Sequence, residues 1–349
     1  MTQAESCISY FSSLIDVLSV DFESPLEIMN QLKDEPYLVL LESITEAMVH
    51  DRYSYIGFDP FLNLVCYQDH FDVLVGQQLI FTSKGTVFDG ISYVLERYQS
   101  REQLSDFHSG LMGFMSYEIV SHIEKLSFQK KRSLGLPLAE FILPRQMVIF
   151  DNIEKQVTLA VHSFNDDEGF DSKATLSQLK SRVLPVKFDS MSPLPEETLD
   201  WLDRSYNSSF SFDDFKSGVR KCLDFIAQGD IFQVQLSRRI QTVLNEHPFY
   251  LYRYLRENNP SPFLFYLSMK HYHLIGASPE ILVGVQDKEV VIRPLAGTRK
   301  RYASDQTESE IVDELIHDPK EKAEHIMLVD LARHDLSRVC EIGSVKVRE

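Results

Sequence analysis

The chain has 349 residues, 44% of them hydrophobic, and a formal net charge of −17 at pH 7. Its length predicts two domains or lobes, and its 23 Phe and 15 Tyr residues are ample for a large core. The acidic balance argues against nucleic acid as a partner, because phosphate backbones are bound by basic patches.

The cysteines and the N-terminus indicate the compartment. The four cysteines have no zinc-site spacing, and they are interpreted as reduced thiols; they are Cys7, Cys66, Cys222 and Cys340. No basic segment followed by an apolar run begins the chain, and no apolar segment approaches the length of a membrane span. We therefore expect a cytoplasmic protein with no membrane partner.

The first part of the chain reads as mixed strands and helices. Residues 36–43 (PYLVLLES) predict a buried strand, and residues 147–163 predict a hairpin around a polar turn. Loop-like composition then fills residues 166–210, apart from a helix expected near 172–183. The sequence therefore predicts an N-terminal domain over 1–165, a linker over 166–210 and a second domain over 211–349.

The second part has sharper patterns. An apolar stripe at helical spacing follows Ser211 and stops at Gly229, which predicts a capped helix. Residues 231–239 (IFQVQLSRR) alternate strictly, which predicts a strand with Gln233 on its polar face. The remaining expected elements are a helix over 247–258, β-rich runs over 262–269, 273–280 and 281–298, helices over 307–317 and 318–336, and a strand-like run over 344–349.

The helix over 318–336 carries an unusual pair of carboxylates. Its middle, residues 326–332, is apolar almost all round, which is typical of a buried helix. Glu321 and Glu324 lie one turn apart at its start. Two such carboxylates suit a hard cation such as Mg²⁺. The alternatives are a solvated helix entrance and, for Glu321, a capping box with Asp318.

Three further motifs are weak when each is taken alone. Gly297 and Thr298 could bind a ligand carboxylate, although most Gly-Thr pairs are turns. Glu280 ends a strand-like run and could act as an acid, although an exposed loop glutamate is the simpler interpretation. Gln233 could equally be an ordinary residue of a sheet face.

In their order along the chain, these motifs resemble the chorismate-utilising enzymes, and among them the large (component I) subunits of anthranilate synthases. The segments that carry the resemblance are GDIFQVQLSRR (229–239), NPSPFLFYL (259–267), GASPE (276–280), RPLAGTR (293–299) and KEKAEHIMLVDLARHDL (320–336). LLES (40–43), RYSYIG (52–57) and GLMGFMSYEIVSHIEKL (110–126) extend it over nearly all of the chain. The resemblance implies an α+β fold with antiparallel sheets packed face to face, outer helices, and an active site between lobes.

The resemblance also implies a reaction. Ammonia adds at ring carbon 2 of chorismate as the carbon 4 hydroxyl leaves, and pyruvate is then eliminated to give anthranilate, the first step of tryptophan biosynthesis. Glu280 matches the general acid, and Gly297 and Thr298 match the pair that contacts chorismate. Glu324 matches a ligand of the Mg²⁺ cofactor, with Glu321 beside it acting through water.

Regulation and partners follow from the same resemblance. Ser43 matches the site at which L-tryptophan inhibits, together with Pro262, Phe263 and Leu264; the alternative for Ser43 is a strand-end hydroxyl. The implied partner is a glutamine amidotransferase subunit (component II) that delivers ammonia, since nothing in the sequence resembles a glutaminase.

Two positions separate related activities. Isochorismate synthases resemble this family but carry Lys where this chain has Gln233, and Gln cannot act as the base that activates water. Aminodeoxychorismate synthases often carry Lys where this chain has Ala296, which cannot act as a nucleophile. Both positions favour an anthranilate synthase, with Gln233 among its catalytic residues.

The chain also departs from the family pattern. Tyr302 stands for a usual Gly, His334 for a usual Asn and Ser337 for a usual Gly. The family continues well beyond residue 349 with a catalytic His, a second pair of Mg²⁺-binding glutamates, and an Arg and a Tyr that bind chorismate. We therefore expect an incomplete fold and no synthase activity from this chain alone. The alternatives are an aminodeoxychorismate synthase component I and a catalytically dead tryptophan-binding fragment.

Overall fold

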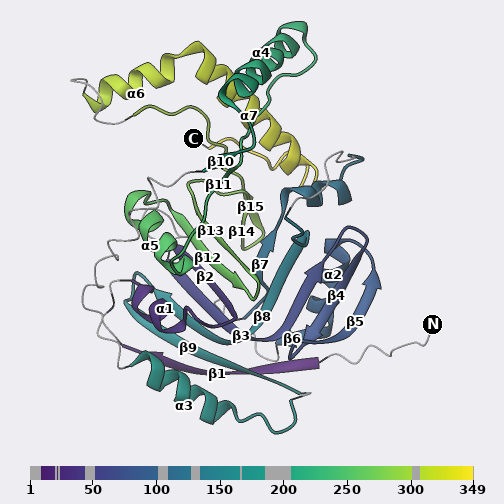
Figure 1. The fold of residues 1–349 in the computed structure, drawn as a ribbon, viewed down its shortest axis with the longest axis vertical. Helices are drawn as coiled ribbons and strands as arrows, with labels where there is room; N and C mark the ends of the chain where they lie inside the picture. The colour runs from purple at the N-terminus through teal and green to yellow at the C-terminus, as the bar shows by residue number, and fades with distance from the viewer. Residues whose placement is uncertain are drawn as a thin grey trace.

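The computed structural model describes residues 9–19, 22, 24–43, 52–100, 109–126, 134–165, 167–184, 206–300 and 307–348. They form the expected α+β fold, with a large, mostly antiparallel sheet and three further helices, α4, α6 and α7, at one end of the molecule (Figure 1). Among the described helices, none is long and apolar enough to cross a lipid bilayer.

One 11-stranded sheet forms the body of the fold, in the order β13-β12-β2-β3-β8-β9-β1-β6. In addition, β4 pairs with β3 and β5, and β7 pairs with β8. Neighbours are antiparallel except β1 and β6, which are parallel. The strands are β1 (Ser9–Leu18), β2 (Tyr37–Ser43), β3 (Tyr53–Cys66), β4 (His70–Val75), β5 (Gln78–Lys84), β6 (Tyr98–Ser100), β7 (Met112–Met115), β8 (Ala139–Asp151), β9 (Gln156–Phe164), β12 (Phe263–Met269) and β13 (Tyr272–Ser278).

The other elements surround this sheet or extend from it. Two short ladders pair β10 (Asn207–Ser208) with β11 (Ile240–Gln241), and β14 (Gly284–Gln286) with β15 (Glu289–Val291). The helices are α1 (Leu26–Leu32), α2 (Val87–Arg97), a 3-10 helix (Tyr117–His122), α3 (Ser172–Val183), α4 (Phe212–Gln228), α5 (Pro248–Asn258), α6 (Glu308–His317) and α7 (Pro319–Ser337).

Strand β2 shows why its sequence is apolar almost throughout. Successive side chains of a strand point to opposite faces, and both faces of β2 are covered except at the exposed Leu41. Leu38 and Leu40 pack in a core cluster that includes residues of α1, α3 and α5. Val39 packs on the opposite face with Leu267 and Met269 of β12. A third cluster joins α2 to β3 and β4.

The large sheet takes strands from both sides of the predicted linker. Strand β12 pairs with β2 over its whole length, so residues 263–278 extend the sheet that residues 9–164 begin. Helix α3, which lies inside the predicted linker, buries Leu179 and Val183 in the core. The division into domains at 166–210 stays a prediction of the sequence.

The helices of the second half agree with the sequence analysis. Ser211 caps α4 through the backbone N–H of Asp214, and Gly229 ends it with a φ of 80°. Pro248 occupies the first turn of α5. Helices α3, α6 and α7, the hairpin β8–β9 and strands β2, β12 and β13 are likewise confirmed.

Three predictions were wrong. Residues 231–239 form no strand, and neither do residues 344–348. Strict alternation favours a strand only where a neighbouring strand supplies backbone hydrogen bonds. In the described part of the chain Arg239 accepts one such bond from Ser209, but residues 231–238 and 344–348 have no strand partner. Helix α7 is not buried: Ile326 is 57% and Leu331 56% exposed, because the described residues place no sheet against it.

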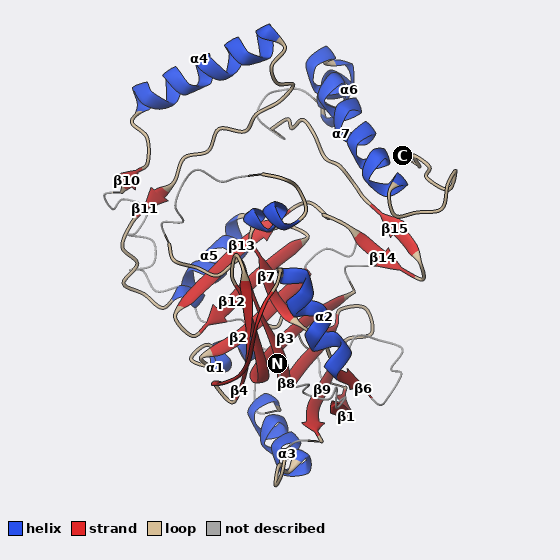
Figure 2. Ribbon diagram, turned by 90° about the vertical axis from the view of Figure 1, so that its right-hand side faces the viewer, coloured by secondary structure: helices blue, strands red, loops and turns tan. Residues whose placement is uncertain are grey.

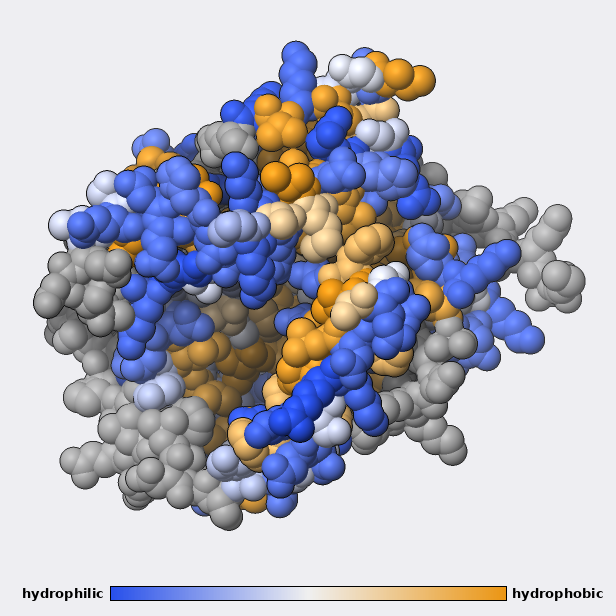
Figure 3. All heavy atoms as spheres, turned by 90° about the horizontal axis from the view of Figure 1, so that it is seen from above, coloured by the Kyte–Doolittle hydropathy of each residue, from blue (hydrophilic) through white to orange (hydrophobic). Residues whose placement is uncertain are grey.

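The exposed apolar side chains of this end of the molecule are visible from above. Figure 3 shows them among hydrophilic residues, on the side where α4, α6 and α7 lie. Figure 2 shows the same three helices outside the sheet, connected to it by long irregular segments. The described part of the chain therefore forms a well-packed sheet with helices on it, and a more open second assembly.

Candidate functional site

The predicted site residues lie in two groups. The first group surrounds the N-terminus of α7 and the irregular segment after β15. The second group lies where β2 pairs with β12.

The N-terminus of α7 is capped by Asp318. Its side chain accepts hydrogen bonds from the backbone N–H groups of Lys320 (2.9 Å) and Glu321 (3.2 Å). These N–H groups, that of Glu321 first, hold the pKa of Asp318 below its ordinary value. The backbone N–H of Asp318 donates to the carbonyl of Leu315, so the Glu321 carboxylate does not complete a capping box.

Glu321 contacts an arginine that the sequence analysis left without a role. Arg299 donates to Glu321 Oε1 (3.2 Å), to Asp318 Oδ2 (2.7 Å) and to Glu314 Oε1 of α6 (3.0 Å). Arg299 lies in the segment RPLAGTR, whose pattern does not indicate which helix the arginine contacts. One guanidinium group thus joins this segment to the corner between α6 and α7.

The Gly-Thr pair lies directly against Glu321. Gly297 has a φ of +56°, and a Cβ atom built on it would lie 2.7 Å from Glu321 Oε2. Only glycine allows this conformation and this approach together. Thr298 is exposed, and its carbonyl accepts a hydrogen bond from Arg299 (3.1 Å).

Gln233 and Glu280 reach the same neighbourhood from distant parts of the chain. Gln233 Nε2 donates to Glu324 Oε1 at 2.9 Å, across 91 positions of sequence. Glu280 follows the end of β13, and its Oε1 accepts from the backbone N–H of Leu295 (3.3 Å), two residues before Gly297. The structure therefore pairs Gln233 with Glu324, places Glu321 against Gly297, and holds Glu280 beside the segment that contains Gly297 and Thr298.

The donor set suits a divalent cation only in part. Glu321 and Glu324 are half-buried on one face of α7, and each has one oxygen engaged by a hydrogen bond. Mg²⁺ in enzymes is commonly held by one or two carboxylates, with water and substrate oxygens completing its shell. These residues fit that pattern, although the described residues contain no group of three or more His, Cys, Asp or Glu that could hold a metal ion.

The second group is built on the register of the large sheet. Ser43 at the end of β2 pairs with Phe263, and its neighbour Glu42 pairs with Leu264. Leu264 is buried, whereas Phe263 and Pro262 are half-buried. Ser43 is 8% exposed, and within the described residues its Oγ has no hydrogen-bond partner.

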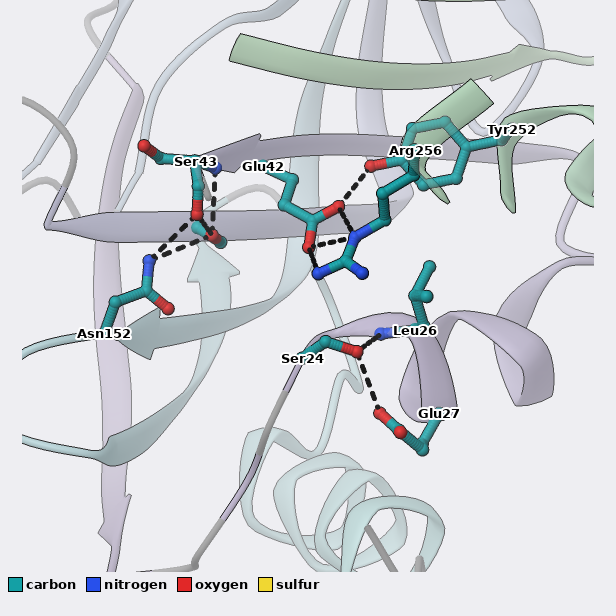
Figure 4. A network of polar contacts seen from close by, with 9 residues as sticks. Ser24, Leu26, Glu27, Glu42, Ser43, Asn152, Tyr252 and Arg256 are labelled. Atoms are coloured by element: carbon teal, nitrogen blue, oxygen red, sulfur yellow. Dashed lines mark hydrogen bonds and ion pairs between the residues drawn. The ribbon is translucent and has the colours of Figure 1, made fainter. Parts of the chain in front are cut away.

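Polar groups fix the backbone at Ser43. Ser54 Oγ accepts from the Ser43 N–H (3.1 Å), and Asn152 Nδ2 donates to the Ser43 carbonyl (3.3 Å). Figure 4 shows Asn152 pointing toward this backbone, with Glu42 beside it. The Ser43 hydroxyl is thus a buried group on a fixed backbone.

Glu42 anchors helix α5 to the same strand, and sequence analysis missed this contact. Its buried carboxylate accepts from Arg256 Nε (3.0 and 2.9 Å) and from the Tyr252 hydroxyl (Figure 4). Burial, followed by the charge of Glu42, raises the pKa of Tyr252 well above its ordinary value. The only sign of this contact in the sequence is a charged residue, Glu42, in a mostly apolar strand, since its partners lie more than 200 positions away.

The chain is similar to a known protein family and to several curated proteins. Residues 58–349 match the family model of chorismate binding enzymes. Anthranilate synthase component 1 of Cereibacter sphaeroides is 33% identical over 95% of this chain and 68% of its own length. Aminodeoxychorismate synthase component 1 of Bacillus subtilis is 35% identical over 89% of this chain and 65% of its own length.

Solved structures give the same picture. Anthranilate synthase component I from Streptococcus pneumoniae has a TM-score of 0.67 and 26% identity, over 88% of this chain and 66% of that chain. The chain therefore spans about two thirds of the length of these relatives.

Proposed function

The chain belongs to the chorismate-binding enzyme family, and we propose that it acts as a component I subunit of an anthranilate synthase, forming anthranilate and pyruvate from chorismate and ammonia. The observation that carries this proposal is a convergence of three contacts: Glu280 accepts from the Leu295 N–H near Gly297, Glu321 lies against Gly297, and Gln233 donates to Glu324 one turn further along α7. Four separate segments of the chain contribute to it.

The proposed chemistry assigns an acid and a binding pair. A carbon–nitrogen bond forms between ammonia and ring carbon 2 while the carbon 4–oxygen bond breaks. The departing hydroxyl leaves as water with a proton from Glu280, which is exposed and held beside the Gly297 segment by the Leu295 N–H. Gly297 and Thr298 would hold the substrate through backbone groups and the Thr298 hydroxyl.

The proposed metal role belongs to α7. Bound Mg²⁺ would neutralise the ring carboxylate of chorismate and spread the charge that develops during the reaction. Glu324 and Glu321 would supply protein oxygens. Gln233, by donating to Glu324 Oε1, would fix the orientation of that carboxylate. As a neutral amide, Gln233 would not remove a proton from water, which suits ammonia as the nucleophile.

The second group is proposed as a site for the inhibitor L-tryptophan. The buried Ser43 hydroxyl offers a hydrogen bond to a polar group of the ligand. Phe263, Leu264 and Pro262 would contribute an apolar wall. A glutamine amidotransferase subunit is the proposed ammonia source, in keeping with the "component 1" names of the relatives.

A second candidate is an aminodeoxychorismate synthase component I, favoured by the 35% identity to the Bacillus subtilis protein. Ala296 argues against it, because an alanine cannot provide the amine that many of those enzymes carry at this position.

Product analysis and binding together test these proposals. The chain is incubated with chorismate, Mg²⁺ and ammonium, products are separated by chromatography, and tryptophan and chorismate binding are measured by calorimetry. We expect both ligands to bind. Anthranilate would establish the synthase reaction, and an aminodeoxychorismate product would establish the second candidate. Tryptophan binding alone would indicate an effector-binding protein, and binding of neither ligand would contradict the proposal.

A further inference from the structure

One arginine side chain joins the Gly297–Thr298 loop of the proposed active site to helices α6 and α7. Arg299 extends from the loop that contains Gly297 and Thr298. Its three guanidinium nitrogens contact Glu314 of α6, the α7 N-cap Asp318, and Glu321 in the first turn of α7. Its side chain is 23% exposed.

We propose that Arg299 is a positioning residue that holds the Gly297–Thr298 loop at a fixed distance from the carboxylates of α7. The inference rests on the proposed function for its consequence, namely metal and substrate binding. The positioning role of Arg299 itself rests on its contacts alone.

All three side-chain partners of Arg299 are carboxylates. Three carboxylates converge here, and without a cation between them they would repel one another. A guanidinium group is planar and carries several N–H donors in a fixed arrangement, so it can hold all three acceptors at once. It also donates to the carbonyl of Thr298, which ties its own loop to the same point.

Arg299 also orients the carboxylate of Glu321. Arg299 engages only Oε1 of this carboxylate, while Oε2 faces the backbone of Gly297. The guanidinium therefore fixes the rotamer that presents Oε2 toward the proposed substrate loop. Loss of Arg299 would free both the loop and this carboxylate.

Arg299→Lys separates geometry from charge. Lysine keeps the positive charge but is a compact point charge that cannot span three carboxylates in this arrangement. Arg299→Gln removes the charge as well. Arg333→Gln is the control, because Arg333 lies on α7 and forms one exposed ion pair with Asp330.

The first readout is hydrogen–deuterium exchange of peptides covering 293–300 and 318–325, measured without metal. We expect exchange in both peptides to increase several-fold in Arg299→Lys and Arg299→Gln, and to remain unchanged in Arg333→Gln. If Arg299→Lys exchanged at the same rate as the wild type, the proposal would be overturned, because a positive charge alone would then be enough to hold the two segments.

The second readout is Mn²⁺ binding, followed by the electron paramagnetic resonance signal of the free ion. Residues that orient metal ligands typically affect affinity by about 10- to 100-fold, so we expect about tenfold weaker binding in both Arg299 variants. If exchange is faster in the variants but the protein binds no Mn²⁺, the positioning role of Arg299 would be upheld and the metal would be removed from the proposed function. If the protein binds Mn²⁺ but exchange is unchanged in the variants, the positioning role of Arg299 would be overturned and the metal would stay in the proposed function.

Discussion

At the scale of single residues, Gly297 combines an unusual backbone conformation with a close contact. Alanine in the left-handed region costs about 1–2 kcal/mol, and at this position its Cβ would also collide with Glu321 Oε2. We predict that Gly297→Ala lowers the free energy of unfolding by about 1 kcal/mol. It should also weaken chorismate binding about tenfold, which corresponds to about 1.4 kcal/mol.

Gly343→Ala is the matched control. Gly343 has a φ of +82°, but a Cβ there would meet no atom within 4 Å. Chemical denaturation should show a similar loss of stability in both variants, and calorimetry should show weaker chorismate binding only in Gly297→Ala. Equal chorismate affinity in the two variants would mean that the contact with Glu321 plays no part in the site.

Glu140 gives a prediction about pH. It lies buried on β8 and accepts a hydrogen bond from the Tyr272 hydroxyl. Burial raises its pKa above the ordinary 4.5, and the Tyr272 hydrogen bond partly opposes this. A raised pKa in the folded state means that the protonated carboxyl favours folding, so its contribution is complete below 4.5 and is lost as the pH rises through the folded-state pKa.

We therefore predict that Glu140→Gln, which stays neutral, gains stability relative to the wild type as the pH rises above 4.5. Tyr272→Phe removes the opposing hydrogen bond and should raise the pKa of Glu140 further. Urea denaturation at a series of pH values measures both effects. A pH-independent difference between Glu140→Gln and the wild type would show that the carboxyl titrates alike in the folded and unfolded states.

At the scale of elements, helix α5 is held on β2 by a buried ion pair. The Glu42 side chain is 1% exposed, and removal of Arg256 would leave its charge buried with one neutral donor, Tyr252. We predict that Arg256→Gln costs about 3 kcal/mol of unfolding free energy. Lys180→Gln breaks another ion pair between a helix and a strand, with Asp16, but that pair is 41% and 33% exposed. It should cost less than about 1 kcal/mol.

Urea denaturation of the two variants gives the comparison directly. Similar losses for Arg256→Gln and Lys180→Gln would mean that water reaches Glu42 and that the pair does not anchor α5.

Helices could be predicted from the sequence because their ends carry local signals. Ser211 and Gly229 bound α4, and Asp318 followed by Pro319 begins α7, through contacts within a few residues. The alternation of residues 231–239 is equally local, yet a strand also needs a partner, and periodicity does not reveal one. The apolar middle of α7 likewise predicted burial from a local pattern, which does not show whether another surface covers the helix.

At the scale of the whole molecule, the large sheet links the two groups of site residues. Ser43, Phe263 and Ser278 lie in one row across β2, β12 and β13. Ser278 Oγ accepts from the backbone N–H of Glu280 (3.3 Å). The proposed inhibitor site and the proposed acid are therefore joined by neighbouring strands of one sheet.

The way the site residues come together could not be predicted from residue patterns. The contact between Gln233 and Glu324, and the pairing of β12 with β2, join segments far apart in the chain. Only the resemblance to chorismate-utilising enzymes suggested that these residues belong to one site. It gave no role to Arg299, whose three partners become visible only when α6 and α7 are placed beside the Gly297 loop.

The most direct test of the proposed site is chorismate binding without ammonium, so that no nucleophile is present. Calorimetric titrations are compared for the wild type with Mg²⁺, the wild type with a chelator, and Glu324→Gln with Mg²⁺. We predict binding in the first case and at least tenfold weaker binding in the other two, because Glu324 supplies a metal oxygen. Binding that is insensitive to both the chelator and Glu324→Gln would contradict the proposed site.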